Sequence, residues 1–98
     1  MRFDWHPKKA VDNVRKHQVA FEVACTIFAD RSILTRHDDQ HSDKEDRSVS
    51  LGLSSRGRIL AVVHTWPEPD NVGEELVRII SARRANKREQ DVYIRRRQ

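Results

Sequence analysis

The chain has 98 residues, the length of one domain with one modest hydrophobic core. Hydrophobic residues make up 37% and charged residues 35% of it, a polar composition whose periodic apolar segments still favour a folded domain over a disordered one. No apolar run approaches the roughly 20 residues that cross a membrane, and the N-terminus has no apolar signal segment, so we expect a cytoplasmic protein. The single cysteine, Cys25, excludes an internal disulfide, and its apolar surroundings in the sequence predict a buried thiol.

The N-terminal third is expected to hold one strand and two helices. Residues 2–5 alternate between polar and apolar side chains, as a short edge strand does, and Pro7 suits the first position of a helix that runs to about His17. The inner face of this helix is expected to carry Ala10, Val11 and Val14. Apolar residues then recur with the spacing of a second amphipathic helix at Phe21, Ala24, Cys25 and Phe28.

The middle of the chain alternates as strands do. Strands are expected at 33–35, 47–53, 58–66 and 76–80, with a hairpin turn at 54–57. The acidic segment 37–46 is expected to be a solvent-exposed loop, and the proline-bearing segment 67–73 cannot lie inside a sheet. The order β-α-α-β-β-β-β-α predicts a single α+β domain, with two N-terminal helices and one C-terminal helix on one side of an antiparallel sheet of about four strands.

The last predicted strand leads into a run of cations. Ser81, a residue type that caps helices, is expected to mark the junction with a helix over 82–93. The N-terminus of a helix binds anions, and arginine adds planar, permanently charged donors. We therefore expect Arg78, Arg83 and Arg84 to converge on one phosphate group.

The net charge of +4 is unevenly distributed along the chain. Residues 77–98 hold eight lysines and arginines against two acidic residues, so this segment carries +6 and the remaining residues carry −2. A basic C-terminal quarter beside a slightly acidic body indicates a polyanionic partner. Charge alone also fits a solvated helix end with no partner, and both interpretations stay open.

Several motifs make the sequence similar to one known family. They are Phe3-x-Trp5-x-Pro7-x-Lys9, Arg15-Lys16-His17, Phe21-Glu22-x-Ala24, Arg47-Ser48-Val49-Ser50-Leu51-Gly52, Val62-Val63-His64-Thr65 and Arg78-Ile79-Ile80-Ser81-Ala82-Arg83-Arg84-Ala85. Across nearly its whole length the sequence resembles the BrnT family, the toxin half of a bacterial type II toxin–antitoxin pair. The resemblance implies a small RNase with a RelE-like α/β fold. Such an enzyme acts on RNA and inhibits translation.

The same resemblance implies a protein partner. A cognate antitoxin, BrnA, with a ribbon-helix-helix DNA-binding domain is expected to neutralise the toxin in a hetero-oligomer with two copies of each. Operator DNA is expected to be bound only through the antitoxin. The sequence departs from the family at Gln18, where members commonly have glycine, and in the acidic segment Pro67–Glu75, which looks longer than usual. Beside the active face, this segment would repel RNA or alter antitoxin docking.

Cleavage of RNA without a metal ion needs a base for the 2′-OH, cations for the crowded phosphorane and an acid for the leaving 5′-oxygen. The reaction is specific for RNA because DNA has no 2′-OH. Candidate catalytic residues are Arg47, His64, Arg78, Arg83, Arg84, Glu89 and Tyr93. Candidate RNA-binding residues are Lys8, Lys9, Lys87 and Arg88. Which residue would be the base and which the acid stays open.

Structural roles compete with these assignments. His64 is the best acid or base by residue type, yet a hydrogen-bonded structural histidine fits the pattern almost equally well. Packing accounts for Tyr93 at least as well as catalysis does, and surface exposure accounts better for Lys8 and Lys9. A non-catalytic module that binds nucleic acid or a protein through the same arginines is the second hypothesis.

One further cluster has the spacing of metal ligands. It consists of His37, Asp38, Asp39 and His41. The segment is an expected loop with no further cysteine or histidine set nearby, whereas a structural metal site needs a complete and well-oriented ligand set. We therefore expect no metal ion and no cofactor.

Overall fold

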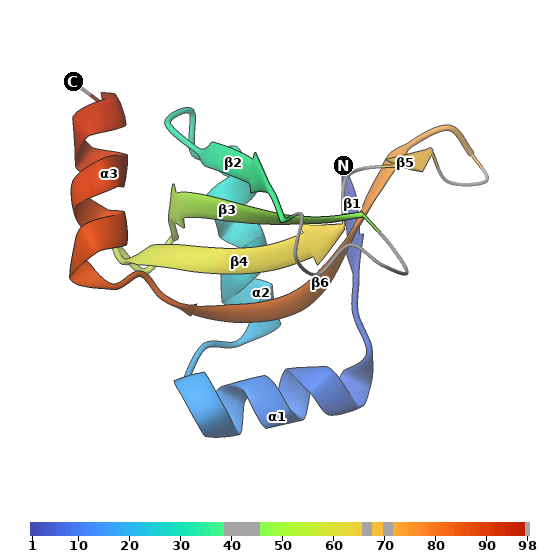
Figure 1. Cartoon of the computed structure of the whole chain (residues 1–98). Helices are drawn as coiled ribbons and strands as arrows, with labels where there is room; N and C mark the ends of the chain where they lie inside the picture. The colour runs from blue at the N-terminus through green and yellow to red at the C-terminus, as the bar shows by residue number, and fades with distance from the viewer. Residues whose placement is uncertain (39–45, 66–67, 70–71, 98) are drawn as a thin grey trace.

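The computed structural model describes residues 1–38, 46–65, 68–69 and 72–97. In chain order its elements are β1 (Arg2–Asp4), α1 (Pro7–His17), α2 (Phe21–Ala24), the 3₁₀-helix η1 (Cys25–Ala29), β2 (Leu34–His37), β3 (Arg47–Leu53), β4 (Ile59–Thr65), β5 (Glu68–Pro69), β6 (Glu75–Arg84) and α3 (Lys87–Arg97). Together they form an α+β fold with one sheet and helices at its two faces (Figure 1).

The strands that the structure describes form a mixed sheet. Their order is β1-β6-β4-β3-β2, and β5 also pairs with β6. The expected antiparallel set is confirmed for β2, β3, β4 and β6. The expectation is wrong for the sheet as a whole, because β1 pairs with β6 in parallel. Strand β6 has ten residues. On one edge it pairs with β4 from Ile79 to Arg84 and with β5 at Glu75 and Leu76, and on the other edge it pairs with β1 over residues 76–78.

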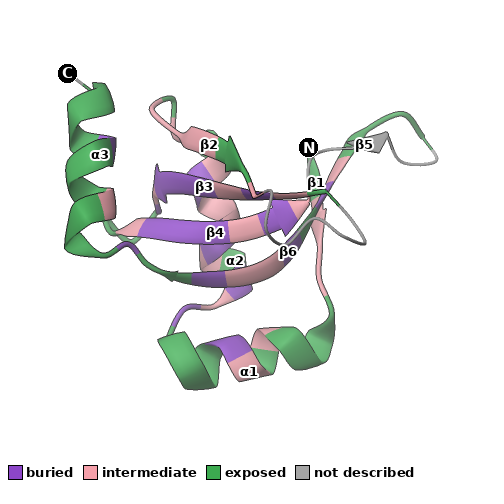
Figure 2. Ribbon diagram, in the orientation of Figure 1, coloured by how far each residue is buried: buried purple, intermediate pink, exposed green. Residues whose placement is uncertain are grey.

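The main hydrophobic core lies between the sheet and the N-terminal helices. Its buried members are Val19, Phe21, Ala24, Ile27, Leu60, Val62, Val77, Ile79 and Ala82. Because side chains alternate along a strand, Leu60 and Val62 point into this core, while Ala61 between them points to the opposite face. Figure 2 shows the buried residues along the centre of the sheet and exposed residues on the outer sides of α1 and α3. Burial raises the pKa of the half-buried Cys25 thiol to about 11, so this thiol stays protonated at neutral pH.

The opposite face of the sheet, called the open face below, carries a smaller apolar cluster. Leu51, Ala61 and Ala85 are buried there, with Leu34 and Ile59 packed against them. Helix α3 covers only one end of this face, beside β3 (Figure 1). The expectation that all helices lie on one side is therefore wrong for α3. The physical reason is this second cluster, which needs a cover of its own.

Helix α1 contacts the sheet through a polar side chain instead of the expected valines. Val11 and Val14 are 59% and 46% exposed, so only Ala10 of the predicted inner face is partly buried. Asn13 is 5% exposed, and its Nδ2 donates to the carbonyls of Val19 and Ala82, each at 2.8 Å. Its Oδ1 accepts from the Ala82 N–H at 3.0 Å.

The end of α1 explains why glycine would fit at position 18. Gln18 has a φ of 56°, in the left-handed region, and it is the non-glycine residue with positive φ in the described part of the chain. Gln18→Gly removes the side chain that makes this conformation unfavourable, and it also loses the hydrogen bond from Gln18 Nε2 to the Arg15 carbonyl. The net change should raise the free energy of unfolding by about 0.5–1 kcal/mol. Urea unfolding measures it. Lys16→Gly, inside the helix, should have the opposite sign, and equal destabilisation by both variants would contradict the argument.

Candidate functional site: a basic groove on the open face

The junction between β6 and α3 positions the cations. Ser81 was expected to start the helix, but it pairs with Val63 and the strand continues to Arg84. The true helix start is a capping box. Asn86 Oδ1 accepts from the Glu89 N–H at 2.8 Å, and Glu89 Oε1 accepts from the Asn86 N–H at 2.9 Å. The prediction failed because a serine in a sheet satisfies its backbone by strand pairing and needs no cap.

The ion pair between Arg83 and Glu89 bridges this junction. Arg83 donates from its two terminal nitrogens to Glu89 Oε1 at 2.7 Å and to Oε2 at 3.0 Å, a two-point contact between planar groups. The hydrogen bonds that Arg83 donates hold the pKa of Glu89 below its usual range, and the same bonds to the Glu89 carboxylate raise the pKa of Arg83. The pair is therefore fully charged at neutral pH, and it fixes the direction of the Arg83 guanidinium.

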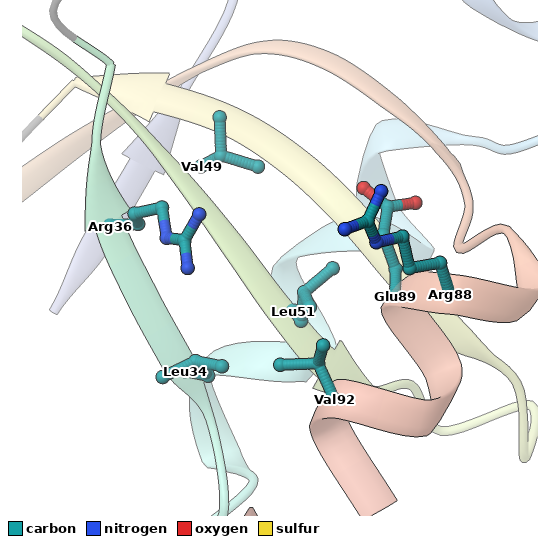
Figure 3. Close-up of a pocket in the computed structure, with 7 residues that line it drawn as sticks. All are labelled: Leu34, Arg36, Val49, Leu51, Arg88, Glu89 and Val92. Atoms are coloured by element: carbon teal, nitrogen blue, oxygen red, sulfur yellow. The ribbon is translucent and has the colours of Figure 1, made fainter.

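A groove of about 330 Å³ lies between α3 and strands β2 and β3. Its lining residues, which define the open-face groove, are Leu34, Arg36, Val49, Leu51, Arg88, Glu89 and Val92. Figure 3 shows Arg36 on one side and Arg88 with Glu89 on the other, with Val49 and Leu51 between them. An apolar floor between guanidinium groups suits a nucleotide, whose base is flat and apolar and whose phosphates are anionic.

Two more of the predicted arginines belong to the open face. Arg47 pairs with Thr65, and the next pair along these strands, Ser48 with His64, is buried on the core side. Because side chains alternate along a strand, Arg47 and Thr65 point to the open face. Arg78 also alternates with buried residues, and its guanidinium bonds Asp4 from Nε at 3.2 Å and from a terminal nitrogen at 3.4 Å. Arg78 lies five residues before Arg83, on the order of 16 Å along a strand. A register shift in β6 between Ile79 and Ser81 restores both arginines to the open face despite this odd separation.

The expected convergence of Arg78, Arg83 and Arg84 on one phosphate is wrong. Arg83 pairs with Ala61 of the open face, whereas Arg84 pairs with Leu60 of the main core and lines a hollow on that side. Consecutive strand residues point to opposite faces, so the error follows from placing both residues on a helix.

His64 lies inside the protein, away from the groove. It is 1% exposed and packs edge-on against Phe28, with ring centroids 4.9 Å apart. Burial lowers its pKa, so the neutral ring dominates at pH 7. Nδ1 lies 2.8 Å from the Thr65 carbonyl, which can only accept, so Nε2 accepts from the Ser50 hydroxyl at 2.7 Å. The Ser50 oxygen in turn lies 2.7 Å from Thr35 Oγ1. These contacts favour the structural alternative for His64.

Tyr93 is also buried, with 0% of its surface exposed. Its hydroxyl donates to Asp30 Oδ2, which also accepts from the Leu53 N–H at 2.9 Å. Burial alone would raise the pKa of Asp30, but the bonds from Leu53, Tyr93 and Ser32 outweigh it and lower that pKa. Burial and the neighbouring carboxylate raise the pKa of Tyr93. Tyr93 therefore anchors α3 to the end of η1, and its hydroxyl does not line the groove.

The candidate RNA-binding residues separate into two groups. Lys8 and Lys9 are exposed on α1, which packs on the side of the sheet opposite the groove. Lys87 and Arg88 are exposed in the first turn of α3, and Arg88 lines the groove directly.

The metal-ligand spacing has no counterpart in the described residues. His37 lies 3.7 Å from Asp46 across exposed side chains, while Asp39 and His41 fall outside the described residues. Within the described ranges, no group of three or more histidine, cysteine, aspartate and glutamate residues has a geometry that would hold a metal ion.

The described part of the acidic insertion lies far from α3 (Figure 1). It includes β5, which pairs with Leu76 and Glu75 at the beginning of β6. Glu75 precedes Arg83 by eight residues, on the order of 26 Å along a strand. This part of the insertion is therefore near the Arg78 end of the open face and remote from the open-face groove (Figure 1).

Sequence reasoning missed three residues of this region. Arg36 lines the groove, but the predicted strand ended one residue before it; longer alternation through Leu34, Thr35 and Arg36 was the available signal. Asn86 caps α3, and the spacing Asn-x-x-Glu is a known start signal. Asp30 joins three segments through tertiary contacts, which leave no trace in a single sequence.

The lowered pKa of Glu89 predicts a pH dependence of stability. A carboxyl group whose pKa falls below its ordinary value of 4.5 on folding stabilises the protein above that value. The stabilisation disappears as the pH falls through the lower folded-state pKa. Glu89→Gln should therefore lower the free energy of unfolding at pH 7, and by less at an acidic pH well below 4.5, as measured by urea unfolding at both values. Asp91→Asn is the matched control, and an equal loss at both pH values would contradict the assignment.

A family model matches most of the chain, and a solved structure shares its fold. The model of the family described as "Ribonuclease toxin, BrnT, of type II toxin-antitoxin system" matches residues 5–89. Among solved structures, the 1.1 Å crystal structure of the Brucella abortus ribonuclease toxin, BrnT, is similar with a TM-score of 0.59 and 22% sequence identity. The similarity covers 89% of this chain and 99% of that one, and it establishes a shared fold. No curated protein matches the sequence. None of the described helices is long and apolar enough to span a membrane.

Proposed function

Because this chain belongs to the BrnT family of ribonuclease toxins of type II toxin–antitoxin systems, we propose that it cleaves RNA without a metal ion, through attack of the 2′-OH. The observation that carries the proposal is the Arg83–Glu89 pair at the edge of the open-face groove. It combines a fixed cation with a carboxylate beside an apolar floor. The proposal includes a RelE-like relationship for the fold, as the sequence resemblance implies.

In the proposed reaction the RNA backbone lies across the open face, with its phosphate against Arg83. The 2′-oxygen attacks phosphorus as its proton passes to a base, the bond to the 5′-oxygen breaks as that oxygen takes a proton from water, and the products are a 2′,3′-cyclic phosphate and a 5′-OH. Developing charge on the phosphorane is stabilised by guanidinium groups, which stay protonated throughout. Arg83, Arg47 and Arg78 are the proposed cations of this face, and Arg88 with Lys87 binds the adjacent backbone.

Glu89 is the proposed base. In the free protein Arg83 occupies both of its oxygens, and the lowered pKa makes it a weak base. A bound phosphate competes with Glu89 for Arg83, and this exchange frees the carboxylate and raises its basicity at the moment when the substrate is in place. His64, Tyr93 and Arg84 are left out of the proposed catalytic set because of their positions.

Membership of a type II family also implies an antitoxin partner. We extend the proposal to a BrnA-like ribbon-helix-helix antitoxin, in a hetero-oligomer with two copies of each protein. Operator DNA is then bound through the antitoxin. A protein that covers the open-face groove would block RNA and neutralise the proposed activity.

One observation favours the second candidate function, a non-catalytic module that binds RNA or a protein. Both oxygens of Glu89 accept hydrogen bonds, and His64, which is buried in the sheet, faces the core. If Arg83 keeps Glu89 when RNA is bound, the face has cations for binding and no free base. The arginines would then matter for affinity alone.

One experiment separates the two functions. Purified protein is incubated in EDTA with an RNA oligonucleotide and with a matched copy that carries a single 2′-deoxynucleotide at the cleavage position. We expect cleavage of the first only, with a 2′,3′-cyclic phosphate on the upstream product. Cleavage that requires Mg²⁺, or cleavage of the deoxy copy, would overturn the mechanism. Binding of both oligonucleotides without cleavage would favour the non-catalytic module.

A further inference from the structure

A second basic site lies on the opposite face from the groove. A hollow of about 310 Å³ opens where the start of α2, the β3–β4 hairpin and the last residue of β6 meet. Three arginines line it, Arg56 and Arg58 from the hairpin and Arg84 from β6. We call this set the arginine hollow. Its floor is apolar and includes Val23 and Leu60.

The charge of the arginine hollow is uncompensated within the described residues. Arg56, Arg58 and Arg84 are exposed, and none of the ion pairs found among the described residues involves them. The lining includes no aspartate or glutamate. Gln18, which follows the last turn of α1, also lines the hollow, and that turn carries the basic residues Arg15 and Lys16. Three arginines in a lining without aspartate or glutamate repel one another, and a bound anion relieves that repulsion.

The position of the hollow connects it with the open-face groove. Arg83 and Arg84 are consecutive residues on opposite faces of β6, so their Cα atoms are about 3.8 Å apart. The strand ends directly after them, and α3 begins at Lys87. In Figure 1 the hairpin, the end of β6 and the start of α3 lie at the same end of the sheet. A polyanion at Arg83 therefore has a short, basic path around the strand end to Arg84.

We propose that the arginine hollow binds phosphates of single-stranded RNA that extends beyond the open-face groove. The proposal rests on the proposed function for the substrate class. Guanidinium groups match phosphate oxygens in two-point contacts, and three of them, two in the β3–β4 turn and one at the end of β6, accept more than one phosphate. Short RNA fills the groove alone, whereas longer RNA reaches both sites.

The test uses the double variant Arg56→Gln/Arg58→Gln and the matched control Arg95→Gln/Arg96→Gln. Both variants lose two positive charges, and the control residues are exposed in the last turn of α3. Affinity is measured by fluorescence anisotropy over a salt series, with 2′-O-methyl RNAs of about 4 and about 12 nucleotides, lengths within the usual range of single-strand sites. Thermal unfolding establishes that each variant is folded.

We expect the hollow variant to bind the longer RNA on the order of tenfold more weakly, and its slope of log affinity against log salt to fall by about 1.4. The shorter RNA and the control should be unchanged. Equal losses for both RNAs, or a loss matched by the control, would overturn the proposal. Unchanged RNA binding with lost binding of a poly-glutamate peptide would overturn it in favour of a surface for an acidic protein segment. Cleavage of unmodified short RNA by the hollow variant reports the proposed function separately.

Discussion

Arg83→Ala should reduce RNA cleavage by about 100- to 1,000-fold while the protein stays folded. Arg83 is the cation that Glu89 fixes from across the strand–helix junction, and removal of one preorganised donor to the charged transition state has an effect of this size. Single-turnover cleavage of a short RNA in EDTA measures it. The loss should appear mainly in the rate of the chemical step, because the other arginines of the open face still bind the backbone.

Two further variants sharpen this test. Arg95→Ala removes an exposed arginine from the last turn of α3 and should leave cleavage unchanged. Glu89→Gln removes the proposed base, and because Arg83 and Glu89 act as a pair, the double variant should be little worse than either single one. Additive losses would contradict a coupled pair. A rate for Arg83→Ala within about threefold of the unaltered protein would place the active site elsewhere.

Asn13→Ala should lower the free energy of unfolding by about 3 kcal/mol. The Asn13 amide takes the place of a neighbouring strand residue at the edge of β6, because it bonds both the N–H and the carbonyl of Ala82. It also bonds the Val19 carbonyl. Alanine would leave three buried backbone groups without these partners, and each unsatisfied group costs about 1 kcal/mol or more. Urea unfolding followed by circular dichroism measures the change.

The neighbouring position supplies the control. Val14→Ala removes a larger apolar side chain from the same helix, but 46% of Val14 is exposed, so the change should stay within about 0.5 kcal/mol. Asn13→Asp keeps the oxygen that accepts from Ala82 and loses both donors, so it should also destabilise the protein strongly at neutral pH. Equal stabilities of Asn13→Ala and Val14→Ala would show that the amide bonds contribute nothing.

Sequence patterns predicted helices and strands correctly where the signal is local to the element. The strand at 47–53 and the helix that starts at Pro7 match the structure, because period-two alternation and proline at a helix start are local signals. Hydrophobicity was used to predict the inner face of the first helix, and that prediction was wrong. The orientation of this helix is set by Asn13, whose buried side-chain amide bonds distant backbone groups. In a sequence, an asparagine at this position is typical of a surface residue.

The candidate site could be predicted in part. Arg83 and Glu89 were chosen from their residue types, and the structure brings them together. The sequence placed both residues on one helix, whereas Arg83 lies on β6 and Glu89 on α3. His64 was chosen because imidazole titrates near neutrality. Its burial against Phe28 follows from the face of β4 on which it lies, and only the folded structure shows which face of that strand points to the core. Residue type thus identified the charged groups, while the faces of β6 and β4 determined which of them meet.

The parallel pairing of β1 with β6 has a consequence for the order of folding during synthesis. This pairing joins residues 2–4 to residues 76–78, and Asn13 bonds a residue 69 positions later. Contacts between distant parts of a chain form late, since a long loop must close before they contribute. The groove also needs Val92 of α3. A nascent chain on the ribosome therefore cannot assemble the open-face groove until residue 92 has left the exit tunnel, so the ribosome has synthesised all of residues 1–91 before the groove exists.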